Sequence, residues 1–121
     1  MTRVRTFLTI EALAFWTAAL VHAGVLLEGY RHREAMIAES VIGGVLALGL
    51  LVSVISSEWT RGAGLAAQGF ALLGTFVGLF TMVIGVGPQS LFDVMLHAGF
   101  VAVLISGLVV AARQGTFGAL A

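Results

Sequence analysis

Four long apolar segments, separated by short polar connections, constrain the fold of this chain more than any other feature of its sequence. A membrane-spanning helix needs roughly 20 consecutive, mostly apolar residues, and we place four such segments at about 6–28, 35–56, 63–86 and 91–112. The short connections imply that neighbouring segments run in opposite directions. The sequence therefore predicts an all-α integral membrane protein, an antiparallel four-helix transmembrane bundle with short loops that forms one domain over residues 1–121.

Composition supports this assignment and narrows the classes of function. Of the 121 residues, 60% are hydrophobic and only 10% are charged, whereas a soluble domain carries about 25% charged residues. The formal net charge is zero, so nothing indicates a nucleic-acid partner. The absence of cysteine excludes disulfides, iron–sulfur clusters and thiolate metal sites. The lipid bilayer is the partner that the composition predicts.

The arginines predict the orientation in the membrane. With four spans, both termini and the second connection share one side, and this side carries Arg3, Arg5, Arg61 and Arg113. The opposite side carries only Arg31 and Arg33. Because basic residues are enriched on the cytoplasmic side, we expect both termini in the cytoplasm, an N-in/C-in topology in a bacterial inner membrane. The first segment is longer than the core of a signal peptide, so we expect a span there.

Small residues recur along the third segment at helical spacing, namely Ala67, Ala71, Gly74 and Gly78. In a membrane, small side chains let two helix backbones approach closely, and packing then stabilises the pair. We expect this stripe to pack against another helix of the same chain. An interface in a homo-oligomer or in a larger membrane complex is the alternative.

Six ionisable or amide side chains interrupt the apolar segments, and they are the candidates for function. They are Glu11, His22, Glu39, Gln68, Asp93 and His97. A charged side chain at the centre of a membrane helix costs on the order of 2.5–3.5 kcal/mol on insertion scales. Such residues are therefore expected to face a partner, a cavity or a ligand.

Four of these residues are predicted to lie at a similar depth, near the outer face. At about 1.5 Å per residue, His22, Glu39, Asp93 and His97 lie within roughly 10 Å of that face. Asp93 and His97 are four residues apart and project from one side of their helix. Two imidazoles and two carboxylates suit zinc, iron, manganese or copper(II), with Asp93 either a ligand or a group that orients a histidine. The rim of this metal site would consist of Glu28, His32 and Gln89.

Other readings of the cluster stay open. His22 and His97 would supply two axial ligands of a haem b, but two adjacent carboxylates favour a non-haem metal over haem. The same side chains would bind protons or cations in a transporter or channel protomer. In a purely structural role, these side chains would form hydrogen bonds with one another and fix the register of the helices in the bundle.

Glu11 and Gln68 form a second pair of polar residues, predicted to lie at a different depth along the helices, closer to the chain termini. An interhelical hydrogen bond between them is the simplest expectation.

The leading hypothesis for the whole chain is a small membrane protein with a His/carboxylate metal-binding module near its outer face. A metal with an open coordination position would activate water, but no substrate or catalytic residue is predicted. The alternatives are a proton- or cation-coupled transporter or channel protomer, and a non-catalytic accessory subunit of a larger complex.

Overall fold

The computed structural model describes the chain over residues 1–120, with side chains described to residue 115. The chain folds into the helices α1 (Thr2–His22), α2 (Arg33–Ile55), α3 (Thr60–Val83) and α4 (Leu91–Leu120), with a short 3-10 helix η1 (Ser57–Trp59) between α2 and α3. Each of the four α-helices is long and apolar enough to cross a membrane. The prediction of an all-α fold with four helices of this kind is confirmed.

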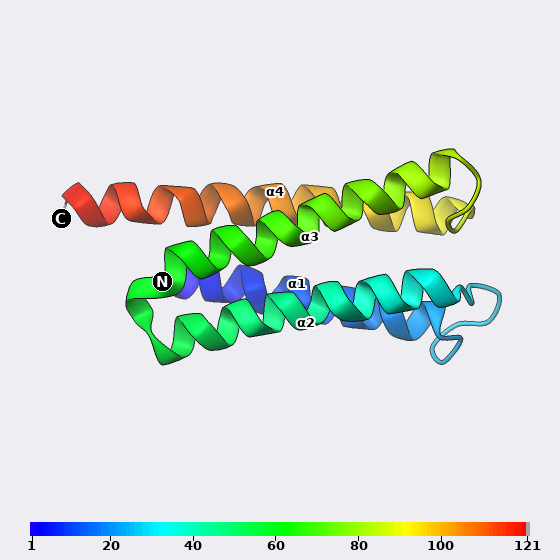
Figure 1. The fold of residues 1–121 in the computed structure, drawn as a ribbon, viewed down its shortest axis with the longest axis horizontal. Helices are drawn as coiled ribbons and strands as arrows, with labels where there is room; N and C mark the ends of the chain where they lie inside the picture. Colours follow the sequence, from blue (N-terminus) through cyan, green and yellow to red (C-terminus); the bar gives the residue numbers. More distant parts are fainter. Residues whose placement is uncertain (121) are drawn as a thin grey trace.

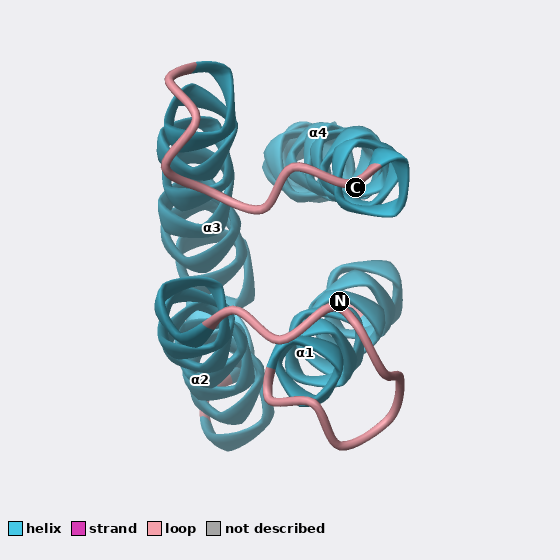
Figure 2. Cartoon of the chain, turned by 90° about the vertical axis from the view of Figure 1, so that its right-hand side faces the viewer, coloured by secondary structure: helices cyan, strands magenta, loops and turns pink. Residues whose placement is uncertain are grey.

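Successive helices run in opposite directions along the long axis of the molecule (Figure 1). α1 packs along α2 and α3 packs along α4, while α3 also contacts α2. In Figures 1 and 2, α3 crosses obliquely, lying near α2 at one end and beside α4 at the other. We call the end that holds the loops 23–32 and 84–90 the hairpin end, and the end that holds both termini and η1 the terminal end.

Two glycines determine where α1 and α3 stop at the hairpin end. Gly24 and Gly85 have φ values of 79° and 82°, a left-handed conformation that glycine adopts without steric strain. After α1, the Val25 N–H donates to the Leu20 carbonyl, and the Gly24 N–H donates to that of Val21. This pair of bonds is a Schellman motif, which ends a helix.

The same motif surrounds Gly85, where the N–H of Val86 donates to Thr81 and that of Gly85 donates to Met82. Hydropathy alone placed the ends of these segments near residues 28 and 86. The helices themselves stop at His22 and Val83, because the backbone turns at the two glycines.

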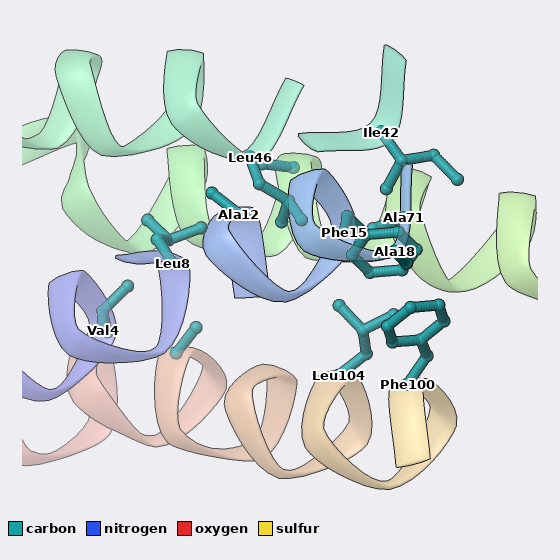
Figure 3. Packing of buried hydrophobic residues seen from close by; sticks show 12 residues of the cluster. Val4, Leu8, Ala12, Phe15, Ala18, Ile42, Leu46, Ala71, Phe100 and Leu104 are labelled. Atoms are coloured by element: carbon teal, nitrogen blue, oxygen red, sulfur yellow. The ribbon is translucent and has the colours of Figure 1, made fainter. Parts of the chain in front are cut away.

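An apolar core runs along the bundle axis and joins all four helices. Leu8, Phe15, Leu46 and Leu104 are almost completely buried in it, and Figure 3 shows their side chains meeting between the helices. The rings of Phe15 and Phe100 stack with their centroids 4.0 Å apart. In a membrane, where lipid chains are as apolar as these residues, close packing between the side chains would stabilise such a bundle.

The small residues of α3 lie against neighbouring helices of the same chain. Ala67 and Ala71 are buried in the core. A Cβ at Gly74 would lie 2.9 Å from Ile42 Cδ1 on α2, and one at Gly78 would lie 3.3 Å from His97 Nε2 on α4. The stripe thus contacts α2 over one part and α4 over another, in agreement with the oblique course of α3.

Polar contacts join three helices at the terminal end. The Arg5 guanidinium donates from Nε to Ser53 Oγ at 2.9 Å and from Nη2 to the Ser53 backbone oxygen at 2.6 Å. The hydroxyls of Ser53 and Thr60 are 2.8 Å apart. Arg5 therefore connects α1 to the last turn of α2 and, through Ser53, to the start of α3.

Candidate functional site

The imidazole of His22 lies between two carboxylates at the hairpin end. Its Nε2 is 2.7 Å from Asp93 Oδ1 of α4, and its Nδ1 is 2.6 Å from Glu39 Oε1 of α2. His22 is 0% exposed, Asp93 3% and Glu39 4%. One buried ring thus joins three helices, and we call these three residues the His22 cluster.

The hairpin after α1 brings α2 to the level of His22. The His22 carbonyl, at the end of α1, accepts a hydrogen bond of 2.8 Å from the His32 N–H. The Nδ1 atom of His32 accepts from the Ala35 N–H at 3.2 Å and caps α2. Its Nε2 atom therefore carries the proton in the neutral ring and donates to the Val86 carbonyl at 3.3 Å, which links the two hairpins.

Asp93 is positioned by a local motif at the start of α4. Ser90 Oγ accepts a hydrogen bond from the Asp93 N–H at 3.1 Å, and Asp93 Oδ2 accepts from the Ser90 N–H at 3.3 Å and from the Ser90 hydroxyl. This reciprocal arrangement is a capping box. One carboxylate oxygen of Asp93 therefore caps the helix while the other contacts His22.

Ser90 was not among the predicted site residues. The signal that identifies it is local: a serine three residues before an acidic residue, directly ahead of an apolar segment, has the pattern of a capping box. The motif fixes the rotamer of Asp93 and so belongs to the site.

His97 lies one helical turn beyond Asp93 and has a different environment. Its Nδ1 is 2.7 Å from the Asp93 backbone oxygen, and because a carbonyl only accepts, Nδ1 must carry a proton. In the neutral ring, Nε2 is then a hydrogen-bond acceptor. The ring also packs edge-on against Phe100, with 5.8 Å between the centroids.

A partly open cavity of about 170 Å³ adjoins the cluster, between α2 and α3. Glu39 and His97 line it together with Phe15 and Phe100, whereas His22 and Asp93 do not. Gly74 and Gly78 form part of the α3 wall, and the loop residues His32 and Pro88 also border the space.

The contacts of the His22 cluster determine its net charge. One ring proton lies between Nε2 and Asp93. The contact between Nδ1 and Glu39 is short but bent from ideal hydrogen-bond geometry, and two unprotonated acceptors at 2.6 Å would repel each other. A second proton therefore resides on the ring or on the Glu39 carboxyl group. With these two protons and no other, the three groups together carry one net negative charge.

The structure brings together three of the four predicted metal ligands. His22 contacts Glu39 and Asp93 directly, while His97 is joined to them through the Asp93 backbone. Both ring nitrogens of His22 face carboxylate oxygens, so the ring offers no free lone pair in this arrangement. Over the part of the chain that the structure describes, no three His, Asp or Glu side chains form a group that could hold a metal ion.

The three predicted rim residues have separate environments. His32 borders the cavity. Gln89 Nε2 donates to the Met82 and Gly87 carbonyls, both at 2.9 Å, and closes the loop between α3 and α4. Glu28 is exposed in the loop between α1 and α2.

This end of the bundle combines a buried cluster of two carboxylates and one imidazole with a small adjoining cavity, which is lined by a carboxylate, an imidazole and two aromatic rings. Such a site can bind a cation or donate and accept protons. No protein family, curated protein or solved structure matches this chain.

Proposed function

We propose that this chain is an integral membrane protein that binds a small organic cation in the cavity beside Glu39 and His97, as a transporter or channel protomer. One observation carries the proposal: the cavity adjoins a buried cluster of two carboxylates and one imidazole, which carries one net negative charge when it holds two protons. A charge in low-dielectric surroundings is costly unless an opposite charge lies close to it. A cation in the cavity would supply that charge.

The groups that line the cavity indicate the chemistry of the ligand. Glu39 lines the cavity, and its Oε2 atom is buried with no hydrogen-bond partner among the described residues; His97 Nε2 is an acceptor. The ligand should therefore donate hydrogen bonds, as a primary ammonium or a guanidinium does. Phe15 and Phe100 line the same cavity, and aromatic faces attract cations.

The membrane assignment is supported by the four helices of spanning length. Large apolar side chains such as Leu13, Leu73 and Phe80 are more than half exposed on the outside of the bundle, where a bilayer would cover them. The distribution of arginines supports cytoplasmic termini, with the His22 cluster toward the opposite face of a bacterial inner membrane.

A divalent zinc, iron, manganese or copper ion is the second candidate ligand. It is favoured by a carboxylate and an imidazole, Glu39 and His97, on one cavity. These two would be ligands, water would complete the coordination, and His22 would orient Glu39. Haem b ranks lower because both ring nitrogens of His22 contact carboxylates.

Calorimetric titration of detergent-purified protein tests the proposal with defined probes: methylammonium, guanidinium, tetramethylammonium and Zn²⁺. Methylammonium or guanidinium should bind, and tetramethylammonium should bind more weakly because it has no N–H group. Glu39→Gln should weaken binding about tenfold or more, equivalent to about 1.4 kcal/mol. Glu58→Gln, which changes an exposed carboxylate at the opposite end, is the matched control.

The alternatives give different results. Stoichiometric Zn²⁺ binding that is lost in both Glu39→Gln and His97→Ala, without binding of the organic cations, would select the metal. Binding of neither class would overturn the proposal and favour an accessory subunit, which co-purification with a larger complex would show. Uptake of labelled methylammonium into proteoliposomes, abolished by Glu39→Gln, tests transport itself.

A further inference from the structure

Three oxygen atoms without a hydrogen-bond donor lie in the interior of the bundle, away from the His22 cluster. Glu11 of α1 and Gln68 of α3 are both 0% exposed. Both carboxyl oxygens of Glu11, and Oε1 of Gln68, have no hydrogen-bond partner among the described residues. Buried acceptors without a donor are strongly unfavourable, most of all within a membrane. A missing donor is therefore expected at this place.

Gly107 of α4 allows the two side chains to approach each other. A Cβ at Gly107 would lie 1.8 Å from Gln68 Oε1 and 2.5 Å from Glu11 Oε1. Because both oxygens lie within 2.5 Å of one point, they are close neighbours. No residue with a side chain fits at this position unless Glu11 and Gln68 move.

The orientation of the Gln68 amide is set by its own helix. Its Nε2 donates to the Gly64 carbonyl at 2.9 Å. Turning the amide over would place Oε1 against that carbonyl, where two acceptors would repel each other. Gln68 therefore presents an acceptor, and not a donor, toward Glu11.

We propose that Glu11 is a proton-binding site: its carboxyl group holds a proton and donates it to Gln68 Oε1. This single proton converts two facing acceptors into an O–H···O hydrogen bond between α1 and α3. It also leaves Glu11 uncharged at a position where its side chain is fully buried. Glu11 forms no ion pair with any residue that the structure describes, so no basic side chain competes with the proton for this role.

The site shares no residue with the cavity beside Glu39 and His97. The two proposals therefore stand or fail separately. A sodium ion is the other species that would complete such a group of oxygens, and the experiment distinguishes it from a proton.

Infrared spectroscopy of the protein in lipid at neutral pH tests the site directly, because a protonated carboxyl group has a carbonyl band that a carboxylate lacks. Subtracting the spectrum of Glu11→Gln should reveal one such band in the wild type. Gln68→Leu should move that band to higher frequency, since the carboxyl group loses its acceptor. Glu58→Gln, at an exposed carboxylate, should leave it in place.

The proposal is overturned if Glu11→Gln removes only carboxylate bands. It is also overturned if the wild type binds radioactive sodium and Glu11→Gln does not. Glutamine is a neutral replacement of nearly the same shape, so Glu11→Gln should remain folded. Circular dichroism and elution volume in detergent check this before the spectra are compared.

Discussion

Ser90 and Asp93 cap each other at the start of α4, and the carboxylate oxygen of Asp93 that Ser90 leaves free lies 2.7 Å from His22 Nε2. A local helix-capping motif thereby fixes a long-range contact between the first and last helices. The same carboxylate stabilises the N-terminus of α4, where negative charge is favourable. Disturbing the cap should therefore also weaken the His22 cluster.

Ser90→Ala should lower the free energy of unfolding by about 1 kcal/mol, the usual cost of losing a helix N-cap. The Asp93 N–H loses its acceptor, and Asp93 Oδ2 keeps only the Ser90 N–H as a donor. Reversible unfolding by SDS in mixed micelles measures this. Ser106→Ala is the matched control, since the exposed Ser106 hydroxyl bonds only to the Ala102 carbonyl of its own helix. Its effect should stay within about 0.5 kcal/mol, and equal losses in the two variants would contradict the role of the cap.

His22→Ala should destabilise the protein by about 3–5 kcal/mol, the usual effect of removing one partner from a buried charged network. The loss leaves Glu39 and Asp93 facing each other without the ring between them. Adding Glu39→Gln to His22→Ala should recover part of the stability, because a neutral amide removes one unpaired charge. The same unfolding titration checks both. The groups are not coupled if Glu39→Gln destabilises the His22→Ala variant by as much as it destabilises the wild type.

Gly107→Ala should destabilise the bundle by about 1–3 kcal/mol, in the range of overpacked interiors, because the new methyl group would overlap Gln68 Oε1 and Glu11 Oε1. Gly99→Ala on the same helix provides the comparison, since a Cβ there meets no atom within 4 Å. That change should be neutral or stabilise α4 by up to about 1 kcal/mol. Thermal melting in detergent ranks the two variants, and the reverse order would contradict the close packing described for Gly107.

Arg5→Ala should cost about 1.5–3 kcal/mol, the range for hydrogen bonds that involve a charged group, since the guanidinium bonds to both the hydroxyl and the carbonyl of Ser53. Arg3→Ala removes the same charge from an exposed neighbouring position and should change stability by less than about 0.5 kcal/mol. The free energies of unfolding of the two variants, measured by the SDS titration, should therefore differ. Equal effects would indicate that net charge, and not the contact with Ser53, is responsible.

The sequence by itself determined the number and kind of the helices. Length and hydropathy are local properties, so four apolar segments separated by short polar connections predict four long helices with little dependence on how they pack. The end of α1 was also predictable in principle, because Gly24 follows it directly and a left-handed glycine is the common terminator of a helix. The unusual polar residues were identified for the same reason, since each stands out against its apolar neighbours.

Only the tertiary structure decided which of those polar residues meet. His22 contacts Glu39 and Asp93, whereas His97 lines the cavity and packs against Phe100. Nothing in the sequence distinguished the two histidines. The physical reason is that these helices are apolar on all sides, so their periodicity does not show which face is turned inward. Helix rotation is set instead by packing between chain segments far apart in sequence, such as Phe15 on Phe100 and the approach of α4 at Gly107.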